Sequence, residues 1–587
     1  MSKVSWYIAW PRMIRHVAAA SPRTFALEYV WSAVNGLALA ATPIVLERIF
    51  QIVLNPGEGA YPFGRLGAWM LCLLAVYLLS EISAGASEYY GEVYSQISAK
   101  TLFGTVNQKA GRLAAIEYEK PELLNRLEKA YPGAIRIRDA VHIIMDILTL
   151  YLPYFLLYGF YLYHTHPVLP PMLIVIFLPV LLSQIVKGKL YAGLEDKTAV
   201  LRRQKQYFAA CMSDKEYAKE TRIHGLRPFF AELYQKAIQR CSRETIKTGK
   251  RAFRIDMGAS CLNMLGFLCM IALLLWLVLK GQIALASFVA VLTSVRTAYD
   301  QMEEIVQQRM GSLSVALALA GNYSGFMAEP EESLGPAERA EVSELSLHGI
   351  GFSYPDGSAA LNGVSFRAAR GDCIAVVGEN GSGKTTLAKL LTGVYEPSAG
   401  SISLGTGPSA EPQTAMLRKN SSQLFQQYNN YRMTVEENVG ISDSEVRDPA
   451  RMEWALETAG FPLRGEQSLT PESMLGREFG GAELSGGQWQ KLAIARAIYR
   501  QGDVLVLDEP TAAIDPEQES DLYHAFAACA KGKICFIITH RLGLVKICDR
   551  ILVMKGGALL DTGTHTELME RCGYYRTLWE AQAGQYK

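Results

Sequence analysis

Residues 378–386 read Gly378-Glu379-Asn380-Gly381-Ser382-Gly383-Lys384-Thr385-Thr386. The apolar run Cys373–Val377 precedes them and the apolar-periodic run Leu387–Leu391 follows, which gives the order strand, loop, helix. Glycines let the backbone N–H groups of such a loop converge on phosphate oxygens, and the helix N-terminus adds its positive end. We therefore predict a P-loop in an α/β domain, with Lys384 on the β- and γ-phosphates and the Thr385 hydroxyl on Mg²⁺.

A second run, Val504–Glu509, reads as a buried strand that ends in two carboxylates. Adjacent strand residues point to opposite faces, so Asp508 can enter the Mg²⁺ shell while Glu509 faces the attacking water. Phosphoryl transfer depends mostly on positioning and charge stabilisation, and a glutamate beside the γ-phosphate serves as general base or orients the water. The pair predicts nucleotide hydrolysis.

The composition limits the class of protein. The 587 residues exceed one ordinary domain, and 58 Lys and Arg against 57 Asp and Glu leave no basic excess for a nucleic-acid partner. Half of the residues are hydrophobic and 20% are charged, against about 25% in soluble domains. The ten cysteines show no metal-binding spacing, which indicates reduced thiols. These features count against a purely soluble enzyme and indicate a chain that is part membrane and part soluble.

Long apolar runs are confined to the first 320 residues or so. Six of them reach the roughly 20 residues that a membrane-spanning helix needs. They are Phe25–Leu54, Leu66–Tyr90, Val141–Tyr163, Met172–Gly193, Met257–Leu279 and Ile283–Gly311. The first is preceded by an amphipathic segment without a signal-peptide pattern, so we expect the chain to start in the cytosol.

The distribution of Lys and Arg predicts the topology. Both are absent from the short loops 55–63 and 164–171 and dense in the long loops 100–138 and 187–251, so the long loops should face the cytosol. Within them, Pro121–Ala130 and Phe229–Ile238 are expected to form short transverse helices, with solvated loops as the alternative. The acidic, proline-containing segment Phe326–Pro336 separates the two halves. We predict a membrane domain at 1–325, a linker at 326–340 and a nucleotide-binding domain at 341–587.

The sequence Leu484-Ser485-Gly486-Gly487-Gln488 opens a predicted helix 20 residues before Asp508 and resembles the signature motif of ATP-binding-cassette (ABC) proteins. With the P-loop, the carboxylate strand and six spans in order, the whole chain resembles an ABC exporter half-transporter. The resemblance implies an all-α six-helix transmembrane domain followed by an α/β P-loop ATPase. It also implies a multi-pass protein of a bacterial-type plasma membrane, with its nucleotide domain in the cytoplasm.

The resemblance also implies roles for further residues around ATP. Tyr354 corresponds to the aromatic residue that stacks on adenine, and Gln426 to the glutamine that senses the γ-phosphate and joins Thr385 and Asp508 around Mg²⁺, although Gln427 is its neighbour. His540 corresponds to the switch histidine at the γ-phosphate. Asp515 corresponds to the D-loop aspartate, although Ala512-Ala-Ile-Asp515 departs from the usual Ser-Ala-Leu-Asp.

One chain carries one P-loop and one signature motif. By resemblance, the helix that starts at Ser485 caps the ATP bound to a second chain, which implies a dimer. A homodimer is the simpler choice, with a heterodimer as the alternative. The segments Glu117–Glu122 and Ala218–Gly225 resemble the parts of the cytosolic loops that lead to the coupling helices of exporters.

The sequence contains fewer indications of which substrate is transported. Glu47, Glu81 and Glu88 lie in the first two spans, which favours either a cationic substrate or pairing within the bundle. Tyr151, Tyr154, Tyr158 and Tyr161 form a stripe that is either packing or a binding wall. The runs Phe425–Asn438 and Leu484–Lys491 are similar to exporters of lantibiotic-type peptides, without the N-terminal peptidase domain of many bacteriocin exporters. We expect peptide export, with a multidrug or lipid exporter and a non-transporting ABC regulator or gated channel as alternatives.

Overall fold

The computed structural model describes residues 6–54, 63–332, 339, 341–405, 413–461, 463, 469–510, 526–539, 541 and 545–583. These residues form two compact units. Unit 1 comprises Met1–Gly111 and Arg126–Glu329, and unit 2 comprises Arg112–Asn125 and Pro330–Lys587. The first long loop therefore contributes a short segment to the second unit.

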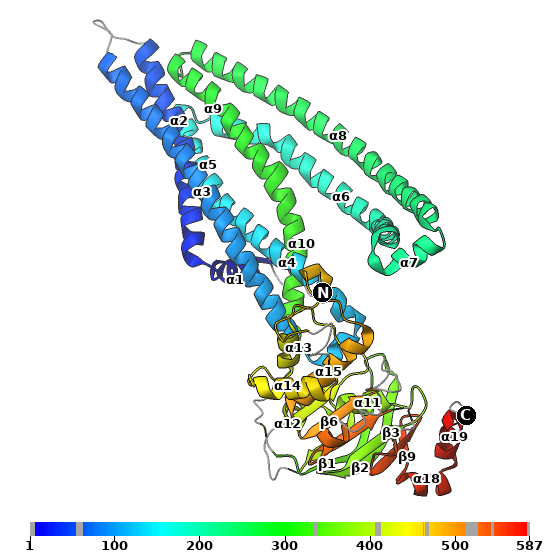
Figure 1. The fold of residues 1–587 in the computed structure, drawn as a ribbon. Coiled ribbons are helices and arrows are strands. Elements are labelled where there is room, and N and C mark those ends of the chain that lie inside the picture. The colour runs from blue at the N-terminus through cyan, green and yellow to red at the C-terminus, as the bar shows by residue number, and fades with distance from the viewer. Residues whose placement is uncertain are drawn as a thin grey trace. The chain divides into compact units, whose positions relative to one another are not determined.

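Unit 1 is built from long helices (Figure 1). They are α1 (Trp6–Ala18), α2 (Pro22–Leu54), α3 (Phe63–Gly111), α4 (Pro121–Asp146), the π-helix η2 (Ile147–Tyr151), α5 (Leu152–Thr165), α6 (Leu169–Ser213), α7 (Lys215–Ile223), α8 (Arg227–Leu279), α9 (Leu285–Glu303), the π-helix η3 (Glu304–Met310) and α10 (Gly311–Met327). Helix α2 packs against α3, α5 and α9, whereas α6 pairs mainly with α8.

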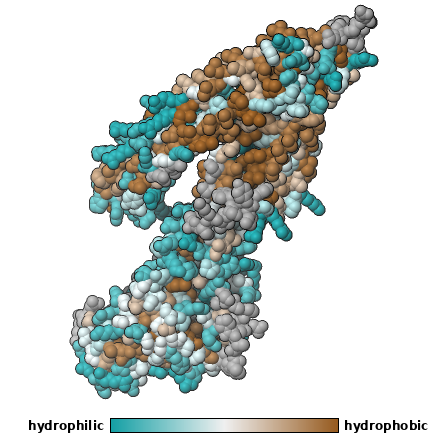
Figure 2. Space-filling model, turned by 180° about the vertical axis from the view of Figure 1, so that it is seen from behind, coloured by the Kyte–Doolittle hydropathy of each residue, from teal (hydrophilic) through white to brown (hydrophobic). Residues whose placement is uncertain are grey.

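Five helical stretches of the described chain are long and apolar enough to cross a membrane. They are Pro22–Leu54, Phe63–Gly111, Pro121–Thr165, Leu169–Tyr191 and Arg227–Leu279. The sixth predicted span, Ile283–Gly311, is helical over α9 and η3 but does not reach the same apolar composition, because Arg296, Asp300 and Arg309 lie on it. On the face shown in Figure 2, hydrophobic side chains gather over the middle of the helical unit and hydrophilic ones lie toward its ends, as expected for helices that cross a membrane.

The second transverse helix lies at a different place from the predicted one. The prediction of a separate helix at Phe229–Ile238 is wrong, since this stretch belongs to the 53-residue helix α8. The short helix is α7, which ends at Ile223. Gly225, with a φ of +62°, lies in the break that follows, and α8 begins at Arg227 with Pro228 in its first turn. Pro121–Ala130 is likewise the first part of α4 rather than a helix of its own, and the short element before it is the 3₁₀-helix η1 (Ala115–Glu119).

The tyrosine stripe of the third span is packing. Tyr151, Tyr154, Tyr158 and Tyr161 are all at most 7% exposed, and the last three belong to the apolar core of unit 1. The Tyr158 hydroxyl lies 3.1 Å from Ser294 Oγ on α9. The stripe therefore ties α5 to the bundle.

The described residues of unit 2 form two sheets. The antiparallel sheet has the order β2-β1-β4, formed by β1 (Glu344–Ser353), β2 (Ala359–Ala369) and β4 (Ala399–Leu404). The larger sheet has the order β5-β6-β7-β3-β8-β9, formed by β3 (Cys373–Val377), β5 (Ser421–Leu424), β6 (Val504–Asp508), β7 (Ile534–Ile538), β8 (Arg550–Lys555) and β9 (Ala558–Gly563). Its strands are parallel except for β9. Strands β3, β6 and β7 are buried along their whole length, as expected for parallel strands covered on both faces.

Helices cover the sheets of unit 2. The described ones are α11 (Lys384–Leu391), α12 (Gln413–Asn420), α13 (Val435–Gly440), α14 (Pro449–Thr458), α15 (Gly486–Arg500), α18 (His565–Arg571) and α19 (Gly573–Ala583), with 3₁₀ turns η4 (Ile441–Asp443) and η5 (Arg477–Phe479). Leu387, Leu390 and Leu391 of α11 pack into one core, and Leu492 of α15 packs into the other. The helical membrane-type unit and the α/β unit together give the predicted fold class.

Candidate nucleotide site

The predicted site residues meet at one edge of the large sheet. Strands β5, β6, β7 and β3 lie side by side and parallel, so their carboxyl ends share that edge. Gln426 follows β5, Asp508 ends β6, and the loop 378–386 follows β3. This is where open parallel sheets bind ligands.

The loop 378–386 requires glycine at specific places. Gly381 and Gly383 have φ values of +80° and +96°, which disfavour any other residue. A Cβ on Gly383 would lie 2.7 Å from the carbonyl oxygen of Ala360, and one on Gly378 would lie 2.3 Å from that of Met554. The loop is therefore wrapped closely by neighbouring backbone, with Gly383 at the N-cap of α11.

Within this loop, the side chains of Lys384 and Ser382 can each donate a further hydrogen bond. Lys384 Nζ donates to the backbone oxygens of Gly378 (2.9 Å) and Glu379 (2.8 Å), and burial lowers the pKa of its ammonium group. The Ser382 hydroxyl is buried and has no hydrogen-bond partner among the described residues. A buried hydroxyl and a buried ammonium group in a glycine-rich loop fit a phosphate, because each would gain an acceptor there.

Asp508 has the features of a metal ligand. The residue is 2% exposed, and its Oδ1 atom has no hydrogen-bond partner among the described residues. Burial raises the pKa of Asp508 to about 6, against the opposing effect of a hydrogen bond from Thr385. Two of the three predicted Mg²⁺ ligands, Thr385 and Asp508, thus lie together, and a cation would relieve the unfavourable burial of this carboxylate.

Glu509 is held in a strained position next to Gln426. Its φ is +50°, a left-handed conformation rare for a residue with a side chain, and its N–H donates to the oxygen of Ile538 at 2.9 Å. Its Oε2 accepts from Gln426 Nε2 at 3.1 Å. Gln427 instead lines a separate cavity of about 330 Å³ with Arg496 and Tyr428. The geometry therefore favours Gln426 over Gln427 at the site.

Gln490 holds the backbone beside Glu509, and the sequence alone did not predict it. It lies on α15, is 2% exposed, and donates through Nε2 to the oxygen of Pro510 at 2.8 Å and, at 3.4 Å, to that of Glu509. It thus fixes the backbone turn that carries Glu509. In the sequence, the one feature that could have indicated this role is a glutamine among the apolar residues of that helix.

The signature segment forms a capped helix start. Ser485 Oγ accepts from the N–H of Gln488, and the Gln488 side chain accepts from the N–H of Ser485 at 2.8 Å. Leu484 is buried, whereas Gly486 and Gly487 begin α15. The Tyr428 hydroxyl donates to the oxygen of Gly486 at 3.2 Å, so the segment after Gln426 contacts the signature helix directly.

Tyr354 belongs to an aromatic and ionic cluster beside the loop. Its hydroxyl lies 3.0 Å from Thr386 Oγ1, and Lys389 Nζ lies 5.9 Å from the centre of its ring. Lys389 also lies 4.7 Å from the centre of the Tyr395 ring and 3.3 Å from a carboxylate oxygen of Glu119. Tyr395 donates to the same carboxylate. The 3₁₀ turn of the first long loop thus contacts the helix that starts at Lys384.

Two predicted residues lie outside the described residues. They are His540, expected at the γ-phosphate, and Asp515, expected at the D-loop. Their roles stay predictions.

Comparisons with known proteins agree with this arrangement. Residues 361–512 match the family model "ABC transporter", a domain that binds ATP. The chain is 27% identical over 521 residues to the subtilin transport ATP-binding protein of Bacillus subtilis, covering 87% of this chain and 84% of the relative. It is 25% identical over 574 residues to the nisin transport ATP-binding protein of Lactococcus lactis subsp. lactis, covering 92% of each. It is 28% identical over 586 residues to the ATP-dependent lipid A-core flippase of Cupriavidus metallidurans, covering 93% of this chain and 92% of the relative.

A solved structure extends the likeness over the whole chain. It is a bacterial Atm1-family ABC exporter with ATP bound, with a TM-score of 0.73, 20% sequence identity, and coverage of 96% of this chain and 98% of that one. The apolar helices, the transport relatives and the exporter fold make the chain a multi-pass protein of the plasma membrane with its nucleotide domain in the cytoplasm. The chain carries an ABC transporter domain at residues 361–512 and has the fold of an ABC exporter.

Proposed function

We propose that two copies of this chain form an exporter that hydrolyses ATP to move a peptide from the cytosol outward. In this proposal Lys384 and the loop 378–386 hold the phosphates, and Thr385, Asp508 and Gln426 hold Mg²⁺. The ion, when bound, would neutralise charge on the β- and γ-phosphates. Glu509 takes a proton from the attacking water or orients it. His540 and Asp515 complete the site at the γ-phosphate and between the two chains.

The observation that carries the proposal is the hydrogen bond from Gln426 to Glu509 beside the orphaned oxygen of Asp508. A buried, unpaired carboxylate oxygen and a strained glutamate are costly features, and such features concentrate where chemistry is done. They count against a non-transporting regulator or gated channel, which has no need of an intact hydrolytic centre. Within this proposal the domain limits are 1–325, 326–340 and 341–587.

Pairing of two chains follows from the incomplete site. The capped helix start at Ser485 offers backbone N–H groups at its N-terminus, which suits an anion. In the family arrangement it closes over the ATP of the second chain. Two identical chains supply two complete sites with closed symmetry, which makes the homodimer simpler than a heterodimer.

Peptide cargo is supported by the subtilin and nisin transport relatives, which match along most of the chain. The match to a lipid A-core flippase, also along most of the chain, favours a lipid exporter as the second candidate. A cationic peptide and a lipid place different charges in the membrane unit. Offering both to the same vesicles therefore shows which of them the protein transports.

The test is ATP-dependent accumulation in inside-out vesicles that carry this chain alone. A cationic lantibiotic-type peptide, a fluorescent lipid and a lipophilic dye are offered in parallel, with vesicles of the Glu509→Gln variant as the blank. Peptide accumulation above the blank supports the proposal. Movement of only the lipid or the dye moves the assignment to a lipid or multidrug exporter.

A further inference from the structure

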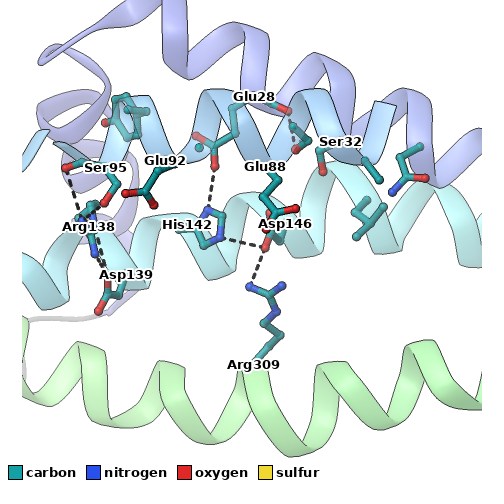
Figure 3. Close-up of a pocket in the computed structure, with 16 residues that line it drawn as sticks. Glu28, Ser32, Glu88, Glu92, Ser95, Arg138, Asp139, His142, Asp146 and Arg309 are labelled. Atoms are coloured by element: carbon teal, nitrogen blue, oxygen red, sulfur yellow. Dashed lines mark hydrogen bonds and ion pairs between the residues drawn. The ribbon is translucent and has the colours of Figure 1, made fainter. Parts of the chain in front are cut away.

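A charged cavity of about 450 Å³ lies within unit 1, between α2, α3, α4 and η3 (Figure 3). None of the motifs that define the nucleotide site contributes to it. We propose that this cavity binds an organic cation, the ammonium or guanidinium group of a larger molecule, with the Glu28 carboxylate as its principal acceptor. The inference rests on the proposed export function only for the claim that the bound cation belongs to cargo.

The lining of the cavity is acidic. Five carboxylates line it against two guanidinium groups, so it stays negative even when its single histidine is protonated. The carboxylates are Glu28, Glu88, Glu92, Asp139 and Asp146, the guanidinium groups are Arg138 and Arg309, and the histidine is His142. A partly enclosed cavity with one sign of charge in excess favours a ligand of the opposite sign.

Both guanidinium groups are already engaged by carboxylates. Arg138 forms a 2.7 Å ion pair with Asp139. Arg309 pairs with Asp146 at 2.8 Å and with Glu304 at 3.2 Å. The positive charges of the lining therefore do not neutralise the remaining glutamates.

Glu28 is the carboxylate that can accept a further hydrogen bond. The residue is 2% exposed, and its Oε1 pairs with His142 Nδ1 at 2.9 Å, whereas its Oε2 is buried without a hydrogen-bond partner among the described residues. A buried carboxylate oxygen without a donor is strongly unfavourable, so an incoming N–H group would be stabilised there. In Figure 3 the Glu28 side chain points from α2 toward His142, and a dashed line joins the two.

Gly91 on α3 leaves the space that Glu28 needs. A Cβ at position 91 would lie 3.1 Å from Glu28 Oε1. Because that distance is shorter than an ordinary contact, any side chain at position 91 would press on the carboxylate. The absence of a side chain there keeps the carboxylate in place beside the cavity.

His142 links Glu28 to the second carboxylate of the cluster. Its Nδ1 faces Glu28, and its Nε2 lies 3.4 Å from Asp146 Oδ2. Asp146 directly precedes the π-helix η2, and Arg309 lies within the π-helix η3. Such bulges occur often at functional sites, and here two of them lie on the two helices that face each other across the cluster.

The chemistry of the lining selects an organic cation over a metal ion. The described residues include no group of three or more His, Cys, Asp or Glu side chains arranged to hold a metal. Serine hydroxyls of Ser32, Ser87 and Ser95 also line the cavity, and its volume suits a small organic group. The ammonium group could belong to a side chain of a transported peptide or to a free polyamine.

The site is tested with dansylcadaverine, a fluorescent primary amine, on the full-length protein in nanodiscs without nucleotide. We expect the wild-type protein to bind it about tenfold or more tightly than N-acetyl-dansylcadaverine, which lacks the charge. Glu28→Gln keeps the shape of residue 28 but removes its charge, so it should weaken amine binding by about tenfold or more and abolish the preference over the acetylated probe. Equal binding of the two probes by the wild-type protein, or unchanged amine affinity in Glu28→Gln, overturns the proposal.

Two further variants distinguish a loss of the binding site from a loss of folding. Glu81→Gln neutralises an exposed carboxylate of α3 two helical turns from Glu88 and outside the cavity, and should bind the amine as the wild type does. Gly91→Ala keeps every charge but places a methyl group against the Glu28 carboxylate, so it should also weaken amine binding. Loss of amine binding in Glu81→Gln contradicts the assignment. Amine binding that stays at the wild-type level in both Gly91→Ala and Glu28→Gln also contradicts it.

Competition identifies the source of the cation. Displacement of dansylcadaverine by a lysine-containing peptide supports a subsite for cargo, and displacement by spermidine alone supports a free-amine site. Displacement by neither overturns the inference. Amine binding without any ATP-driven transport leaves the site intact and refutes only the proposed export function.

Discussion

Glu119 is the point at which the first long loop contacts the nucleotide-binding helix. Its carboxylate accepts from the Tyr395 hydroxyl and lies 3.3 Å from Lys389 Nζ, and Lys389 is on the helix that starts at Lys384. The Tyr395 hydrogen bond, aided by Lys389, holds the pKa of Glu119 below its usual range. We predict that Glu119→Gln loosens this contact and uncouples hydrolysis from transport.

The magnitude follows from the exposure of the two partners. The Glu119 side chain is 42% exposed and that of Lys389 is 22% exposed, so the ion pair contributes about 0.2–1 kcal/mol. The hydrogen bond to a charged acceptor contributes roughly 1.5 kcal/mol, the low end of the usual range, because the carboxylate is partly solvated. Glutamine retains part of the hydrogen bond. The net loss is about 1–2 kcal/mol, which weakens the contact roughly 5- to 30-fold.

The assay measures peptide transported per ATP hydrolysed in the same proteoliposomes. We expect Glu119→Gln to hydrolyse ATP while moving several-fold less peptide per ATP. Glu122→Gln is the matched control, since Glu122 is an exposed carboxylate of the same segment. A Glu119→Gln variant with the wild-type ratio would show that this contact does not transmit the nucleotide state.

Three other substitutions probe the nucleotide site. Lys384→Ala removes the buried ammonium group and should weaken ATP binding about tenfold or more, as measured with a fluorescent nucleotide; unchanged affinity would exclude its phosphate role. Gly383→Ala places a methyl group 2.7 Å from the Ala360 oxygen at a φ of +96°, and should destabilise the domain by about 1–3 kcal/mol in thermal unfolding. Gln490→Ala removes the hydrogen bond to the Pro510 oxygen and should lower the hydrolysis rate more than ATP affinity; equal loss of both would make Gln490 merely structural.

Local patterns predicted the nucleotide half of the fold well. The strands Cys373–Val377 and Val504–Asp508 occur where the apolar runs indicated them, because their buried sequences and flanking glycines leave few alternatives. The second transverse helix was misplaced because amphipathic periodicity continues through Phe229–Ile238, and only the backbone conformation of Gly225 shows where the helix breaks.

Residues defined by tertiary contacts could not be predicted in the same way. The choice between Gln426 and Gln427 depended on which side chain reaches Glu509, and the importance of Gln490 depends on a backbone turn 20 residues away. Glu28 gave no sequence signal, because its partner His142 and the cluster residue Arg309 are distant in sequence. Glu88 was singled out and lines the cavity, whereas Glu47 is occupied by hydrogen bonds from Ser287 and Gln51.

Glu509 has the central part in the proposed function, as the residue that activates water for ATP hydrolysis. The decisive measurement compares steady-state hydrolysis and ATP binding of purified Glu509→Gln with those of the wild type in the presence of Mg²⁺. Loss of a general base should slow hydrolysis by about 10²- to 10⁴-fold, with ATP still bound and the two chains held together. Hydrolysis by Glu509→Gln at the wild-type rate would contradict the assigned chemistry.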